Sequence, residues 1–154
     1  MNWRNPWRKF SSRVSDAVEA LAGGERSVGA VATYHDSCRA RHGQGLASQP
    51  REVMRRLCGD GFRELPEADV CCGGAGAFSF LNPELSEEVL RRKIGAIAGI
   101  QARLVATSST SCLIQLAHGL KKYYPECRVV HISELAAAGV GEPFRSGSIS
   151  GTGA

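Results

Sequence analysis

Residues 104–112 have the sequence LVATSSTSC, and this stretch shows how the chain is built. The segment from Leu104 to Thr107 fits a short buried strand, and a polar run follows it. A helix is predicted next, because the apolar residues between Leu113 and Leu120 recur on one helical face. A strand, a polar loop and a helix in this order are typical of a parallel sheet with crossover helices.

The same unit recurs along the chain. Further strands are predicted at residues 28–34, 62–65 and 128–132, each followed by a loop with polar or cysteine residues and then by a helical segment. We therefore predict an α/β fold, a single domain with a mostly parallel four-stranded sheet and crossover helices, over residues 28–138.

Both ends of the chain fall outside this pattern. Residues 1–27 are predicted to form an N-terminal helical extension, in which Trp3, Trp7 and Phe10 share one face between basic residues. This aromatic stripe suits peripheral contact with the inner face of a membrane or with a partner, and it equally suits covering the domain's own core. Residues 139–154 are rich in Gly and Ser and are predicted to be a disordered tail.

Composition narrows the class of protein. A chain of 154 residues buries on the order of two-thirds of its unfolded surface and needs no disulfides. Six cysteines, without a signal-peptide pattern or a long apolar run, predict a cytoplasmic protein whose reduced thiols serve as ligands or redox groups. A net charge of +4 is modest, so we expect no nucleic acid as partner.

The most unusual motif is Cys71-Cys72-Gly73-Gly74. Adjacent strand residues point to opposite faces, so both thiols serve one centre only where the backbone turns, and glycines permit such a turn. A disulfide between them would be strained, because consecutive α-carbons lie about 3.8 Å apart and an unstrained bridge needs roughly 4.4 Å. We interpret the motif as the loop that forms the base of a metal or iron-sulfur site. The alternative is a pair of buried small apolar residues.

Two more thiols are expected beside this motif. The strand-to-helix loops of a parallel sheet emerge at one edge, and Cys38 and Cys112 lie in loops of this kind, as the double cysteine does. Helix N-termini at that edge stabilise thiolates, and four thiolates match either zinc or a [4Fe-4S] cluster. Cys58 and Cys127 lie nearer the opposite edge, and we assign them to packing.

Polar neighbours are also candidates for the site. His35 and Asp36 precede Cys38 and would relay protons or hydrogen-bond a cluster sulfur, although Asp36 equally suits capping of the loop backbone. His131 follows at the end of the last predicted strand. It is either an alternative zinc ligand or a structural residue.

These motifs together resemble the cysteine-rich CCG domain family. The resemblance is carried by YHDSC at 34–38, LPEADVCCGG at 65–74, AT at 106–107 and CLIQ at 112–115, and it covers about residues 28–138. The family includes the iron-sulfur protein of glycolate oxidase, lactate utilisation protein A, and components of anaerobic glycerol-3-phosphate dehydrogenase and of heterodisulfide reductase. Long members carry a ferredoxin-like region and two CCG domains, and this chain resembles the C-terminal CCG unit only.

The resemblance implies a set of ligands. By position, the residues that match the family's cluster-binding cysteines are Cys38, Cys71, Cys72 and Cys112. Ser109 stands where the first cysteine of a C-x-x-C pair would be, and a hydroxyl is an unlikely replacement for a thiolate ligand. We therefore expect Ser109 and Gly73 to surround the centre, together with His35 and Asp36, without binding it directly.

The resemblance also implies a function. We expect an iron-sulfur electron-transfer domain or subunit of a flavin-dependent 2-hydroxyacid oxidoreductase complex acting on glycolate or lactate, with a [4Fe-4S] cluster or, alternatively, zinc. Its partners would be the flavoprotein dehydrogenase subunit and other iron-sulfur subunits, and substrate chemistry would lie in the partner. One alternative is a zinc-binding or metal-free docking module without redox activity. Another is a thiol-redox protein working through Cys71 and Cys72.

Overall fold

A parallel sheet forms the centre of the computed structural model, which describes residues 30–138; the predicted N-terminal extension and C-terminal tail lie outside this range. The sheet has three strands in the order β1 (Ala32–Tyr34), β2 (Leu104–Thr107) and β3 (Arg128–His131). Ala32 lies opposite Leu104, and Leu104 lies opposite Arg128. The predicted α/β class with parallel strands is therefore confirmed.

The predicted four-stranded sheet is not confirmed in the described part of the chain. Residues 62–65 run beside β1 but pair with it at an isolated parallel bridge between Phe62 and Ala32. The backbone N–H of Arg63 donates to the Ala32 carbonyl at 2.9 Å. Beyond this bridge the Arg63 carbonyl accepts the Thr33 hydroxyl at 2.7 Å, and the Asp36 N–H donates to the carbonyl of Ala68, so residues 62–65 form no continuous ladder with β1.

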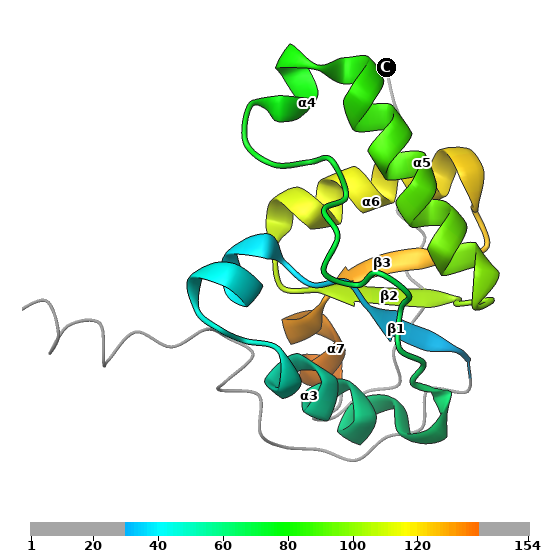
Figure 1. Ribbon diagram of the computed structural model, residues 1–154. Coiled ribbons are helices and arrows are strands. Elements are labelled where there is room, and N and C mark those ends of the chain that lie inside the picture. The colour runs from blue at the N-terminus through cyan, green and yellow to red at the C-terminus, as the bar shows by residue number, and fades with distance from the viewer. Residues whose placement is uncertain (1–29, 139–154) are drawn as a thin grey trace, which may run out of the picture.

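Helices cover both faces of the sheet, so the domain has three layers (Figure 1). Helices α3 and α7 pack on one face, and α5 and α6 pack on the other. The helical elements are η1 (Arg39–Gly43), α3 (Ser48–Cys58), η2 (Gly59–Gly61), α4 (Phe78–Leu81), α5 (Pro83–Gly99), α6 (Thr110–Tyr123) and α7 (Ile132–Ala138). Between residues 30 and 138, no helix is both long and apolar enough to cross a membrane.

Each face of the sheet has its own apolar cluster. The cluster under α3 and α7 includes Tyr34, Met54 and Ile132, and the cluster under α5 and α6 includes Ile94 and Leu116. Each large aliphatic side chain buried in this way stabilises the fold by about 1.5–3 kcal/mol relative to an exposed one. The sheet is thereby fixed between two helical layers, and its carboxyl edge is left for polar loops.

Helices α5 and α6 approach each other closely. A Cβ atom at Gly119 of α6 would lie 2.8 Å from the side chain of Leu90 on α5, so a larger residue there would force the helices apart. Leu90, Ile94 and Ile97 are buried, which confirms the predicted stripe on α5. The two helices form a rigid wall beside the carboxyl edge of β2.

Candidate metal centre

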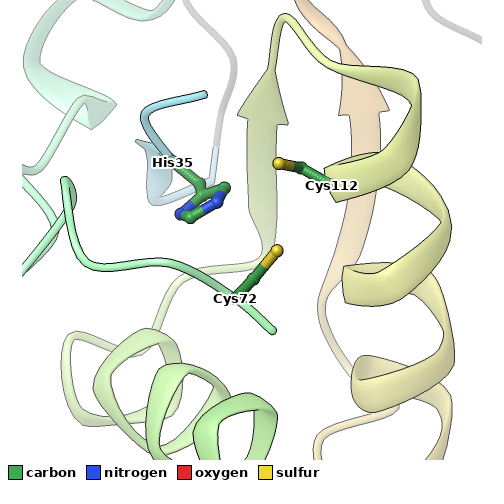
Figure 2. Close-up of side chains that lie close together, drawn as sticks. All are labelled: His35, Cys72 and Cys112. Carbon is green, nitrogen blue, oxygen red and sulfur yellow. The ribbon is translucent and has the colours of Figure 1, made fainter. Parts of the chain in front are cut away.

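Three buried side chains from different elements meet at the carboxyl edge of the sheet. His35 directly follows β1, Cys72 lies in the loop that precedes α4, and Cys112 lies in the first turn of α6. One ring nitrogen of His35 and the two sulfurs all lie within 4.8 Å of one another, and Figure 2 shows the three side chains pointing toward a common point. The exposed fraction is 1% for His35, 0% for Cys72 and 7% for Cys112.

The glycines after the double cysteine allow its loop to enter the narrow space between α5 and α6. Gly73 has a φ of 86°, in the left-handed region, and a Cβ there would lie 2.7 Å from the backbone oxygen of Ser86. The Ser86 hydroxyl donates to the Gly73 carbonyl at 3.0 Å. A Cβ at Gly74 would lie 2.7 Å from Cβ of Gln115 on α6. The two glycines therefore set the depth at which Cys72 is held.

The two adjacent cysteines point in different directions. Cys72 is fully buried, whereas Cys71 is exposed and its sulfur accepts the backbone N–H of Gly73 at 3.3 Å. Cys38 is half-buried and precedes η1. In the described part of the chain, the structure brings Cys72 and Cys112 together with His35, while Cys38 and Cys71 lie outside this group.

A hydrogen bond between Cys72 and Cys112 shifts the pKa values of these two buried thiols in opposite directions. The pKa of Cys112 is lowered, first by a hydrogen bond from Cys72 and then by His35 and the Ser109 hydroxyl. The pKa of Cys72 is raised by the same hydrogen bond and by burial. Of the two sulfurs, Cys112 is therefore the one whose surroundings favour the thiolate. The Ser109 hydroxyl contacts this thiol, and its role beside a bound centre stays a prediction.

A buried cation, Lys93, lies on α5 near the same thiols. Lys93 is 2% exposed, and its Nζ donates to the backbone carbonyl of Glu67. Burial lowers the pKa of this lysine, and the nearby charges of Cys72 and Cys71 act in the opposite direction. Lys93 is not among the site residues predicted from the sequence. The sequence does hold a sign of its burial, because this lysine falls within the apolar stripe formed by its neighbours on α5.

Asp36 holds the loop after β1 rather than a thiol. Its carboxylate accepts two hydrogen bonds from Arg51, at 3.0 and 2.9 Å, and lies 3.5 Å from Arg41. The pKa of Arg51 is raised, mainly by the bond to Asp36. The Asp36 N–H donates to the carbonyl of Ala68 at 3.0 Å, which ties the start of the double-cysteine loop to β1. The ion pair fixes the loop that carries His35, and the backbone hydrogen bond holds this loop beside the double-cysteine loop.

The remaining histidine and cysteine candidates lie elsewhere. His131 Nδ1 is 2.5 Å from the Ser133 hydroxyl, and His131 is not part of the three-residue group. Cys58 belongs to the apolar cluster under α3 and α7, and Cys127 belongs to the cluster under α5 and α6. Burial raises the pKa of Cys58 to about 11 and that of Cys127 to about 12. Both behave as packing residues.

A polar cavity of about 640 Å³ opens beside the three-residue group. Its walls come from the loop and turn after β1, including Ser37 and Arg39, and from the serine-rich segment 108–111 at the start of α6. Ser109 lines this cavity and also contacts the Cys112 thiol. The carboxyl edge is therefore polar and open on one side of the buried group.

The donor set fits a metal or metal-sulfur group. Thiolate and imidazole are the ligands that zinc and iron-sulfur centres use. The buried Nδ1 of His35 has no hydrogen-bond partner among residues 30–138, and an atom of this kind calls for a bound group or water. Cys72 and Cys112 would hold such a group from the protein interior.

An α/β domain with buried thiols at the carboxyl edge of a parallel sheet belongs to the class of thiol-rich domains suited to metal-sulfur sites. The family model described as CCG, cysteine-rich domain, matches residues 32–117 of this chain. The chain belongs to this family.

Known proteins from several bacteria are similar to the chain. It is 32% identical over 113 residues to the probable glycolate oxidase iron-sulfur subunit of Bacillus subtilis, a match that covers 72% of the chain and 26% of that protein. It is 31% identical over 103 residues to lactate utilization protein A of Oceanobacillus iheyensis, covering 67% of the chain and 42% of that protein. It is 26% identical over 139 residues to the uncharacterized protein YkgE of Escherichia coli, covering 86% and 58%. The chain thus spans between about a quarter and three-fifths of the length of these relatives.

Proposed function

We propose that this chain is an iron-sulfur electron-transfer domain or subunit of a flavin-dependent 2-hydroxyacid oxidoreductase complex acting on glycolate or lactate. The observation that carries the proposal is the buried meeting of Cys72 and Cys112 with His35, in a chain of the CCG family. Two of its relatives are named as a glycolate oxidase iron-sulfur subunit and a lactate utilization protein.

The proposed cofactor is a [4Fe-4S] cluster, which needs one sulfur ligand for each iron. The proposed thiolate ligands are Cys38, Cys71, Cys72 and Cys112. Burial of Cys72 and Cys112 excludes water from one side of the site, whereas the exposure of Cys71 leaves the other side at the surface. Electron transfer with a partner protein requires a centre close to the surface on at least one side.

The rest of the proposed complex supplies the chemistry on the substrate. The partners would be a flavoprotein dehydrogenase subunit, which takes electrons from the 2-hydroxyacid, and other iron-sulfur subunits, which pass them on. Within this chain, Lys93 offsets part of the negative charge of the thiolates, and the pair of Asp36 with Arg51 fixes the loop that carries His35. We propose that the complex works in the cytoplasm, and peripheral contact with the membrane through residues 1–27 stays a prediction.

Zinc is the second candidate, and one observation favours it. The donors gathered by the structure are two thiols and an imidazole, and mixed Cys and His sets are typical of structural zinc sites. A zinc-bound or metal-free chain would act as a docking module for other subunits, without redox activity.

The test is anaerobic reconstitution of the full chain with iron and sulfide, followed by iron, zinc and sulfide analysis, optical absorption and electron paramagnetic resonance. The proposal predicts about four irons and four sulfides per chain and a signal that appears or disappears on reduction. Stoichiometric zinc without iron would overturn it in favour of the docking module. A metal-free protein with a reversible thiol couple would instead favour redox chemistry at Cys71 and Cys72.

A further inference from the structure

We infer that His35 is itself a ligand of the metal-sulfur centre and binds it through an imidazole nitrogen, beside the thiolates of Cys72 and Cys112. This inference rests on the proposed function and deepens it, because it replaces an all-thiolate site with a mixed one. It also changes the role expected for His35, from a hydrogen-bonding neighbour to a direct donor.

The first support is the position of the ring. One nitrogen lies within 4.8 Å of both sulfurs, and Figure 2 shows the imidazole facing the space between Cys72 and Cys112. The backbone holds it there, because the His35 N–H donates to the carbonyl of Ala106 on β2 at 2.9 Å. The side chain is almost fully covered, since the exposed fraction of His35 is 1%, so turning toward solvent is not open to it.

The second support is an unsatisfied atom. Nδ1 of His35 is buried and has no hydrogen-bond partner in the part of the chain that the structure describes. Leaving such a group unpaired costs about 1–3 kcal/mol. The carboxylate nearest in sequence, Asp36, is taken by Arg51 at 2.9 and 3.0 Å. The polar contact that the ring does make is a hydrogen bond to the Cys112 thiol, itself a proposed ligand, so it holds the imidazole at the site.

The third support is the number of donors. Ser109 occupies the position where the resemblance places a cysteine, and its hydroxyl contacts Cys112. Cys71 points to the surface, so the interior side of the site holds two sulfurs and the imidazole. His35 thus supplies the third donor on the interior side, in place of Cys71 as a ligand of the all-thiolate set. A neutral imidazole also carries one negative charge less than a thiolate, and this raises the reduction potential of an iron-sulfur centre.

The test uses the full chain reconstituted anaerobically with iron and sulfide and labelled with ¹⁵N only in histidine. Pulsed electron paramagnetic resonance of the paramagnetic state should show a strong isotropic nitrogen coupling, as expected for direct iron-nitrogen bonding. The coupling should vanish in His35→Gln, whose amide still forms hydrogen bonds. His131→Gln is the matched control, because His131 lies at the carboxyl end of β3 but contacts Ser133, and it should leave the coupling unchanged.

A second variant keeps the inference testable if His35→Gln binds no iron. His35→Cys supplies a thiolate in place of the imidazole, so it should retain iron and sulfide and shift the midpoint potential downward. Circular dichroism and thermal unfolding of each variant will show whether the fold is kept. A folded His35→Cys protein that binds iron at an unchanged potential would contradict direct ligation.

The outcomes separate this inference from the proposed function. Iron and sulfide bound with only weak nitrogen coupling would overturn the ligand role of His35, which would then be a hydrogen-bond donor, and would leave the electron-transfer proposal intact. If the unaltered chain binds no iron, the electron-transfer proposal fails. Cobalt(II) titration, followed by its visible absorption, then decides the ligand question. His35→Ala should weaken cobalt binding by more than about 100-fold, the upper range for an outer-shell partner, and an affinity equal to that of the Ser109→Ala control would overturn the inference.

Discussion

Two pairs of buried cysteines in this domain have similar exposure and different surroundings. Cys72 and Cys112 expose 0% and 7% of their surface, and Cys58 and Cys127 expose 0% and 4%. The first pair lies at the carboxyl edge of the sheet with His35, whereas Cys127 directly precedes β3 and Cys58 ends α3. Burial by itself therefore does not distinguish a ligand thiol from a packing thiol.

The polar groups around each thiol make the difference. At the carboxyl edge, a hydrogen bond from Cys72, the His35 ring and the Ser109 hydroxyl lower the pKa of Cys112. Burial among apolar neighbours raises the pKa of Cys58 to about 11 and that of Cys127 to about 12. Cys112 is therefore prepared to carry negative charge, whereas burial keeps Cys58 and Cys127 neutral.

The largest expected effect comes from exchanging one thiol in each pair for a hydroxyl. Cys72→Ser should lose the bound iron, because a serine hydroxyl is a far less acidic and harder donor than a thiol. Cys127→Ser should keep it and lose only part of its folding stability, since its hydroxyl enters an apolar cluster. Iron and sulfide analysis after anaerobic reconstitution measures both. Equal iron contents in the two variants would remove the distinction between the pairs.

The next effect concerns the loop that holds only the first pair. Gly74→Ala would place a Cβ 2.7 Å from Cβ of Gln115 and 3.2 Å from the backbone oxygen of Ser111. This overlap should lower the free energy of unfolding by about 1–3 kcal/mol and reduce iron binding by displacing Cys72. Chemical denaturation and iron analysis measure the two effects.

Gly95 provides the matched control for this change. Gly95 lies on the exposed side of α5, and a Cβ there meets nothing within 4 Å. Gly95→Ala should raise the free energy of unfolding by about 0.5–1 kcal/mol and leave iron binding unchanged. A Gly74→Ala protein as stable as Gly95→Ala would show that the loop is not wedged between the helices.

Much of the fold could be predicted because it depends on local patterns. Apolar runs followed by polar loops and amphipathic helices indicated three of the strands and the parallel order, and the buried stripe of α5 followed from helical periodicity. The fourth strand was predicted from the same pattern at 62–65. It forms one bridge only, because pairing needs successive backbone groups to meet those of β1, and that depends on the path of the segment in space rather than on its apolar pattern.

The candidate site could be predicted less completely, because it depends on side-chain direction. Topology correctly placed Cys72 and Cys112 at one edge, since the ends of parallel strands are fixed by the sheet. The outward direction of Cys71 depends on the positive φ of Gly73, and the burial of Lys93 depends on the path of the loop through Glu67. Contacts of this kind join residues far apart in the chain and leave no regular spacing in the sequence from which they could be predicted. The roles of Cys38 and Cys71 as ligands stay predictions.

A smaller effect should come from the charge of Lys93, which lies near Cys72 of the first pair of buried cysteines. Lys93 is a buried cation near Cys72 and Cys71, so Lys93→Met removes positive charge close to the proposed centre and should shift its midpoint potential downward. Lys121→Met is the control, because Lys121 is an exposed residue of α6. Redox titration followed by optical absorption measures both potentials. Equal shifts in the two variants would mean that Lys93 acts only through the net charge of the protein.

The smallest effect is a pH dependence carried by the packing pair. The pKa of Cys127 is raised from 9.0 to about 12, so the folded protein keeps this proton at pH values where the unfolded chain loses it. Stability from this group is complete below pH 9 and declines as pH rises toward 12, by about 1.4 kcal/mol per pH unit. Cys127→Ala lowers stability at every pH by removing packing atoms. Its decline between pH 9 and 10 should nevertheless be smaller than that of the unaltered chain by about 1 kcal/mol, because the unfolded thiol is only half ionised at pH 9. Urea denaturation of the metal-free proteins at pH 8, 9 and 10 compares the two slopes, and identical slopes would show that Cys127 is ionised as readily in the folded state as in the unfolded one.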